Sequence, residues 1–108
     1  MGRDRSRHRS EFTRALRAAQ DGSPAGFEWL WHRFGRQVSA FARLQGSEDP
    51  DGLAGLVFEA AFRRIGSFDG DSTAFVSQLF AIARNKVIDE RRRRSRRPST
   101  TALTGRFD

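Results

Sequence analysis

Apolar residues recur every three or four positions in four separate runs of this 108-residue chain. Such spacing places them on one face of a helix, and no stretch alternates with the period of two that a strand requires. The runs predict helices over roughly residues 10–20, 24–45 and 50–65, and a fourth that begins near residue 72. A chain of this length forms one domain. The sequence therefore predicts an all-α fold, a compact bundle of about four helices with short loops.

Capping residues separate these runs. Three dipeptides are typical of helix starts, two of them with proline at the first helical position: Ser23-Pro24, Asp49-Pro50 and Asp71-Ser72. Three glycines follow apolar runs, where a left-handed residue commonly ends a helix: Gly22, Gly46 and Gly66. The capping pattern thus supports the same four helices as the apolar spacing.

Basic charge is concentrated near the two ends, although the formal net charge of the whole chain is +7. Residues 84–97 carry eight basic and two acidic residues, and residues 1–9 carry four arginines and one aspartate. The apolar stripe of the last helix stops after Ala83, so its last three turns are expected to project with a polybasic end. We expect a basic flexible arm over 1–9, the helical domain over 10–97, and a linker or tail over 98–108.

Composition excludes several kinds of site. The chain has no cysteine, which rules out disulfides, cysteine-bound metals and thiol catalysis. With His8 and His32 as the only histidines, we expect no metal site, no cofactor and no enzymatic activity. No apolar run is long enough to cross a membrane, and the N-terminus lacks the apolar stretch of a signal peptide. We therefore expect a cytoplasmic protein without a membrane partner.

Two pairs of aromatic residues leave alternatives open. Phe58 and Phe62 lie roughly 100–140° from the centre of the apolar face of the third helix. They either pack under the first helix or form an exposed patch that docks a protein partner. Phe68 and Phe75 bracket a short polar loop, and they either pack in the core or offer an aromatic surface to a nucleic-acid base. The adjoining arginine run favours nucleic acid over a merely solvated helix end.

Two motifs follow each other in the C-terminal half. The first is Phe68-Asp69-Gly70-Asp71-Ser72-Thr73-Ala74-Phe75. The second is Leu79-Phe80-Ala81-Ile82-Ala83-Arg84-Asn85, followed by Ile88-Asp89 and by Arg91-Arg92-Arg93-Arg94. Together they resemble region 2 of bacterial RNA polymerase sigma factors of the sigma-70 family, extracytoplasmic-function group. The resemblance covers about residues 24–97.

The resemblance implies a non-enzymatic domain that docks on the clamp helices of the polymerase β′ subunit and captures and opens the −10 promoter element. It implies contacts to promoter DNA, in which the loop holds a base flipped from the non-template single strand and the fourth helix tracks the DNA backbone. The residues implied are Phe68, Asp69, Gly70, Asp71, Ser72, Arg84, Asn85, Lys86, Arg91, Arg92 and Arg93. It implies a polymerase contact from the third helix: Leu53, Leu56, Val57, Phe58, Glu59 and Arg63. Members of this group are often held inactive by an anti-sigma protein, so such a partner is implied as well.

The chain departs from this family pattern in two places. Where the family usually carries Asp-Leu-Val-Gln-Glu, this chain has Gly55-Leu56-Val57-Phe58-Glu59. Either Phe58 supplies a hydrophobic contact instead, or the chain is a degenerate sigma-like regulatory module without productive binding to core polymerase. The residues after Pro98 do not resemble the helix-turn-helix domain that reads the −35 element, so we expect an excised domain rather than a standalone relic. An unrelated basic helical protein that binds duplex DNA is a third alternative.

Overall fold

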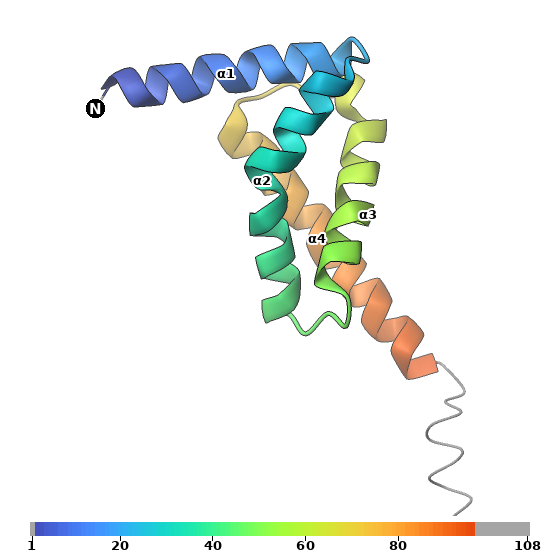
Figure 1. Ribbon diagram of the computed structural model, residues 1–108. Helices are drawn as coiled ribbons and strands as arrows, with labels where there is room; N and C mark the ends of the chain where they lie inside the picture. Colours follow the sequence, from blue (N-terminus) through green and yellow to red (C-terminus); the bar gives the residue numbers. More distant parts are fainter. Residues whose placement is uncertain (1, 97–108) are drawn as a thin grey trace, which may run out of the picture.

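The computed structural model describes the backbone of residues 2–96 and the side chains of Arg7 and of residues 9–96. The elements in chain order are α1 (Gly2–Gln20), α2 (Pro24–Leu44), α3 (Pro50–Arg63), the short 3-10 helix η1 (Ile65–Ser67) and α4 (Ser72–Arg96). No strand occurs within residues 2–96. In Figure 1, α2 and α3 stand side by side, α4 crosses behind them, and α1 lies across their upper ends. The predicted all-α bundle of four helices is confirmed.

Most of the predicted helix ends are present. The carboxylate of Asp49 accepts a hydrogen bond from the Gly52 N–H at 3.1 Å, as a cap of α3. Ser23 precedes α2 with the extended backbone of a cap, but its side chain makes no capping hydrogen bond. Gly22 and Gly46 each have φ of +86°, a left-handed conformation that costs glycine little. These glycines let the chain reverse after α1 and α2.

The prediction of a left-handed end at Gly66 was wrong. Gly66 lies inside η1 and is not among the positive-φ glycines of the described residues. After α3 the chain tightens into a 3-10 turn, in which the Phe68 N–H donates to the Ile65 carbonyl at 3.1 Å. Because the side chain of Ile65 is buried in the core, this turn keeps the backbone close to the bundle.

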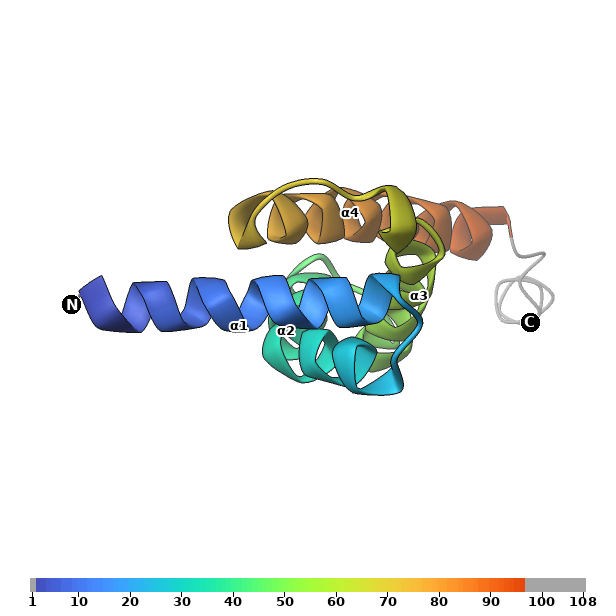
Figure 2. The same cartoon turned by 90° about the horizontal axis from the view of Figure 1, so that it is seen from above.

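The first helix is longer than predicted, since it begins at Gly2 rather than near residue 10. Residues 2–9 contain no large apolar side chain, so apolar spacing gives no signal for a helix there. Seen from above in Figure 2, the N-terminal end of α1 runs beyond the other helices. The division of the chain into arm, domain and tail stays a prediction, and residues 98–108 lie outside the described part.

The core is built from all four α-helices around Phe75. The Phe75 ring centroid lies 5.7 Å from the centroids of both Phe12 in α1 and Phe34 in α2. The side chain of Phe75 is only 1% exposed, so it belongs to the core, one of the two alternatives for this residue. Buried Leu79, Ala83 and Val87 continue the packed face of α4 toward its C-terminus. The packed face therefore extends one turn beyond Ala83, where the sequence had placed its end.

The contact between α1 and α2 depends on Gly26. A Cβ atom on Gly26 would lie 2.4 Å from the Ala19 nitrogen and 2.7 Å from the Ala15 carbonyl oxygen. Atoms of a side chain cannot approach backbone atoms so closely. Glycine therefore lets the two helices touch backbone to backbone near the start of α2.

Candidate nucleic-acid and protein interfaces

The loop before α4 is exposed and rests on an aromatic ring. Asp69, Gly70 and Asp71 are exposed, whereas Phe68 is half-buried. The Phe68 ring packs edge-on against the Phe75 ring, with centroids 5.4 Å apart. A Cβ on Gly70 would lie 3.2 Å from Cζ of Phe68, so glycine allows the loop to fold closely over this ring. Phe68 thus backs a polar loop, while Phe75 supports it from the core.

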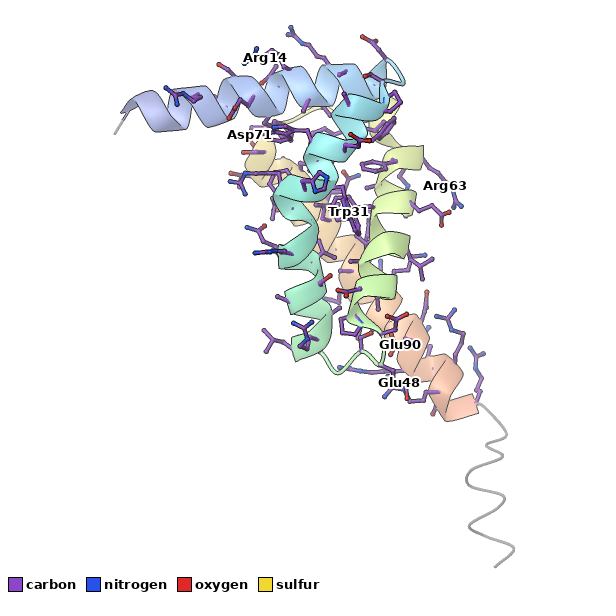
Figure 3. The ribbon with its side chains drawn as sticks, in the orientation of Figure 1. Arg14, Trp31, Glu48, Arg63, Asp71 and Glu90 are labelled. Carbon is purple, nitrogen blue, oxygen red and sulfur yellow. The ribbon has the colours of Figure 1, made fainter. Side chains whose placement is uncertain are left out.

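Asp71 has a structural role at the start of α4. Its Oδ1 accepts a hydrogen bond from the Ala74 N–H at 2.9 Å, which caps the helix. Figure 3 shows Asp71 at this end of α4, below α1. The capping hydrogen bond uses one acceptor site of one carboxylate oxygen, so Asp71 keeps acceptor sites for a ligand.

Gln20, at the end of α1, holds the same loop from behind. Its Nε2 donates to the carbonyl oxygens of Ile65 at 2.9 Å and of Phe68 at 3.0 Å. No local sequence pattern indicates this role, because the partners lie 45 and 48 positions away. Gln20 therefore fixes the backbone on which the Phe68 ring is mounted.

The residues of α4 between Arg84 and Arg93 that the resemblance assigns to DNA lie on three of its sides. Exposed Arg84, Asn85 and Arg92 lie on the side opposite the buried face. Lys86 and Arg93 lie toward α3, where they help to line a shallow groove of about 450 Å³. Arg91 lies toward the loop after α2.

Arg91 also contacts the rest of the bundle. Its Nη2 donates to the Gln45 carbonyl at 2.7 Å. Of the seven α4 residues that the resemblance assigns to DNA, three are exposed on the side away from the buried face: Arg84, Asn85 and Arg92.

Glu90 ties the end of α4 to the loop between α2 and α3. Its carboxylate accepts hydrogen bonds from the Ser47 hydroxyl and the Glu48 N–H, each at 2.8 Å, and from the Arg94 guanidinium at 2.7 Å. The backbone hydrogen bond from Glu48 is the largest of the effects that lower the pKa of Glu90, and Ser47 and Arg94 add to it. Figure 3 shows Glu48 and Glu90 where α4 passes this loop. Glu90 and Arg94 therefore anchor part of the last three turns, which were expected to project.

The six residues of α3 assigned to polymerase divide into two sets. The side chains of Leu53, Val57 and Phe58 are buried. Leu56 is 44% exposed, and Glu59 and Arg63 are exposed as well. Glu59 and Arg63 form a loose ion pair of 3.7 Å that solvent screens. The exposed set is available to a partner, and the buried set supports it from beneath.

The family of the chain follows from a comparison of its sequence with family models. The model described as sigma-70 region 2 matches residues 30–97, more than half of the chain. The chain belongs to the sigma-70 region 2 family. No curated protein and no solved structure shows a significant match. Membership implies a non-enzymatic domain of transcription initiation, which binds RNA polymerase and recognises the promoter −10 element in general.

One alternative expected Phe58 and Phe62 of this region 2 domain to pack under the first helix. Apart from each other, the rings that they contact belong to α2 instead. Phe58 is only 2% exposed, and its ring packs edge-on against Trp31, with centroids 5.0 Å apart. Phe62 is half-buried and packs against Phe27 at 4.6 Å. The other alternative, an exposed patch, is wrong for Phe58.

Sequence reasoning missed an apolar groove of the region 2 domain between α2 and α3. The groove has a volume of about 460 Å³ and is lined by Phe27, Glu28, Trp31, Gly55, Phe58, Glu59 and Phe62. Trp31 is 38% exposed, although it belongs to the run of apolar residues at helical spacing that forms α2. Apolar spacing gives the face of a helix but not the depth of each residue. Trp31 therefore belongs to a surface that the sequence did not indicate.

Two kinds of site are not found in the described part of the region 2 domain. No group of three histidine, aspartate or glutamate side chains among its described residues could hold a metal ion. His32 lies exposed on α2. None of the helices within residues 2–96 has the length and apolar character needed to span a membrane.

Proposed function

We propose that this chain is the promoter-recognition domain of an alternative sigma factor of the extracytoplasmic-function group. In this proposal it binds the clamp helices of the polymerase β′ subunit and recognises and melts the −10 element in the cytoplasm. The observation that carries the proposal is the placement of an exposed polar loop, with Asp69 and Asp71, at the start of the helix that presents Arg84 and Arg92.

The loop is proposed to hold a base of the non-template strand. A base taken out of the stack needs an apolar surface and hydrogen-bonding groups at its edge. The half-buried ring of Phe68 offers such a surface beneath the loop. Asp69, Asp71 and Ser72 supply acceptors and a hydroxyl beside it, and Gly70 keeps the backbone close to the ring.

The outward face of α4 is proposed to follow the DNA backbone. Arg84 and Arg92 are separated by eight residues, so they lie about 80° apart around the helix and both face solvent. Asn85 lies about 20° beyond Arg92 around the helix and can donate or accept hydrogen bonds. Lys86, Arg91 and Arg93 occupy the flanks and add positive charge on either side.

The exposed part of α3 is proposed to contact the polymerase. Leu56, Glu59 and Arg63 present an apolar side chain and two opposite charges to solvent. An anti-sigma protein that covered this surface and the outward face of α4 would block both activities at once.

Salt-dependent binding to single-stranded DNA tests the DNA-binding part. The probe is a fluorescein-labelled pool of single-stranded oligonucleotides, titrated with the full chain at several salt concentrations. Replacing two phosphate contacts in the double variant Arg84→Ala/Arg92→Ala should reduce the slope of log affinity against log salt by about 1.4. The matched control Arg36→Ala/Arg43→Ala removes two exposed arginines from α2 and should leave most of the slope unchanged. Equal effects of the two double variants would contradict the assignment to α4.

One observation favours a second candidate, a degenerate regulatory module without productive polymerase binding. The family usually has an aspartate and a glutamine where this chain has Gly55 and Phe58, and the Phe58 ring is buried. A pull-down of core RNA polymerase by the folded chain, with Glu59→Ala as a control, separates the two candidates. Binding that Glu59→Ala weakens supports the sigma factor, and no binding at low or high salt supports the second candidate.

A further inference from the structure

The groove between α2 and α3 has an apolar interior and an acidic rim. Its interior is formed by four aromatic residues and one glycine: Phe27, Trp31, Phe58, Phe62 and Gly55. Glu28 and Glu59 lie at its edge and are exposed. None of the described residues that line the groove is basic. Figure 3 shows Trp31 between the two helices.

Gly55 opens this groove. A Cβ placed on Gly55 would meet no atom within 4 Å, so the space beside α3 is open at this position. The indole of Trp31, at 38% exposure, stands beside that space and is held edge-on by the buried Phe58 ring. An exposed tryptophan that its neighbours already hold in place loses little conformational freedom on binding. Such aromatic residues carry much of the binding energy in protein interfaces.

The charge around the groove defines what fits into it. A large apolar side chain can enter between Trp31 and Gly55, since nearly all of the lining is apolar. Arginine or lysine residues on either side of that side chain would meet Glu28 and Glu59 at the rim. The groove lies between two helices that stand side by side (Figure 1), and a third helix can pack against such a pair.

We propose that this groove receives a large apolar side chain from a helix of core RNA polymerase, flanked on that helix by basic residues. The inference rests on the proposed function, because it takes core polymerase as the partner. It also gives Gly55 and Phe58 a role. The polar contacts that the resemblance implies at these two positions are replaced by insertion of an apolar side chain beside Trp31.

Filling the groove tests this inference without removing any core side chain. In Gly55→Leu the new side chain occupies the open space, and leucine favours a helix over glycine, so the variant should melt no lower than the natural chain. The matched control is Gly66→Leu, since a Cβ on Gly66 also meets nothing within 4 Å and lies outside the groove. Binding of the full chain to purified core polymerase is measured by biolayer interferometry. We expect Gly55→Leu to bind about 30-fold more weakly, and Gly66→Leu to bind as the natural chain does.

Charge at the rim provides a second, independent measurement. Glu28→Lys reverses an exposed charge at the groove and should weaken polymerase binding, more strongly at low salt than at high salt. If the natural chain binds polymerase but both Gly55→Leu and Glu28→Lys bind equally well, the groove is not the contact and the inference is overturned, while the proposed function stands. If the natural chain, confirmed as folded, does not bind polymerase at all, the polymerase part of the proposed function fails, and the inference fails with it.

Discussion

Alanine at two helical glycines should change stability in opposite directions. At Gly55 a Cβ meets no neighbouring atom, so Gly55→Ala gains only the better helix propensity of alanine, about 1 kcal/mol. At Gly26 a Cβ would lie 2.4 Å, 2.7 Å and 2.9 Å from three backbone atoms of α1. These backbone atoms cannot rotate away, as the end of a side chain could.

The cost at Gly26 follows from this geometry. Ordinary contact begins at 3.4 Å, so α1 and α2 must separate locally by about 1 Å. Overpacking of this kind costs about 3 kcal/mol at the upper end of its usual range. Subtracting the gain of about 1 kcal/mol in helix propensity leaves Gly26→Ala less stable by about 2 kcal/mol.

Thermal unfolding followed by far-ultraviolet circular dichroism measures both effects. For a domain of this size, about 1 kcal/mol shifts the melting temperature by about 5 °C. Gly26→Ala should therefore melt about 10 °C below the natural chain, and Gly55→Ala about 5 °C above it. If the melting temperature of Gly26→Ala equals or exceeds that of the natural chain, close backbone contact between α1 and α2 is not the reason that glycine is needed at position 26.

Three further predictions concern the anchors of α4 and its loop. Because the pKa of Glu90 in the folded chain lies below its ordinary value of 4.5, Glu90 stabilises the fold above that pH, and the contribution disappears as pH falls through the lowered pKa. The melting temperature of Glu90→Gln should thus lie furthest below that of the natural chain above pH 4.5, and approach it as the pH falls below 4.5. Asp71→Ala removes a helix cap and should lower the free energy of unfolding in urea by about 1 kcal/mol, whereas Asp69→Ala, at an exposed loop position, should change it little. Gln20→Ala removes two hydrogen bonds behind the loop, so amide hydrogen exchange around Phe68 should become faster, and an unchanged rate would contradict that role.

Local patterns were sufficient to predict the helices and most of their ends. Apolar residues at helical spacing placed α2 and the start of α4 within a residue or two of their observed bounds. The left-handed glycines at the ends of α1 and α2 were equally visible in the sequence. These features depend on residues that are close together in the chain, so they can be predicted from one sequence.

Features that depend on distant residues were not predicted. Gln20 and Glu90 act on segments more than 40 positions away, and no local pattern indicates such hydrogen bonds. The exposure of Trp31 was missed for a related reason, since it depends on how α3 passes α2 and on the missing side chain at Gly55. The polar N-terminal turns of α1 have no apolar face, so their helical structure was also not predicted.

Because α4 is one uninterrupted helix, it fixes the distances between the residues proposed to contact a DNA strand. From Ser72 to Arg84 the helix rises about 18 Å, and from Ser72 to Arg92 about 30 Å, at 1.5 Å per residue. For a strand that keeps the duplex spacing of 3.4 Å per nucleotide, these distances correspond to about five and about nine nucleotides. Inserting one residue between the loop and Arg84 would shift the arginines by about 1.5 Å and turn them by about 100° relative to the loop. In the proposed function, the length of α4 therefore sets the distance between the recognised base and the DNA phosphates that the arginines contact.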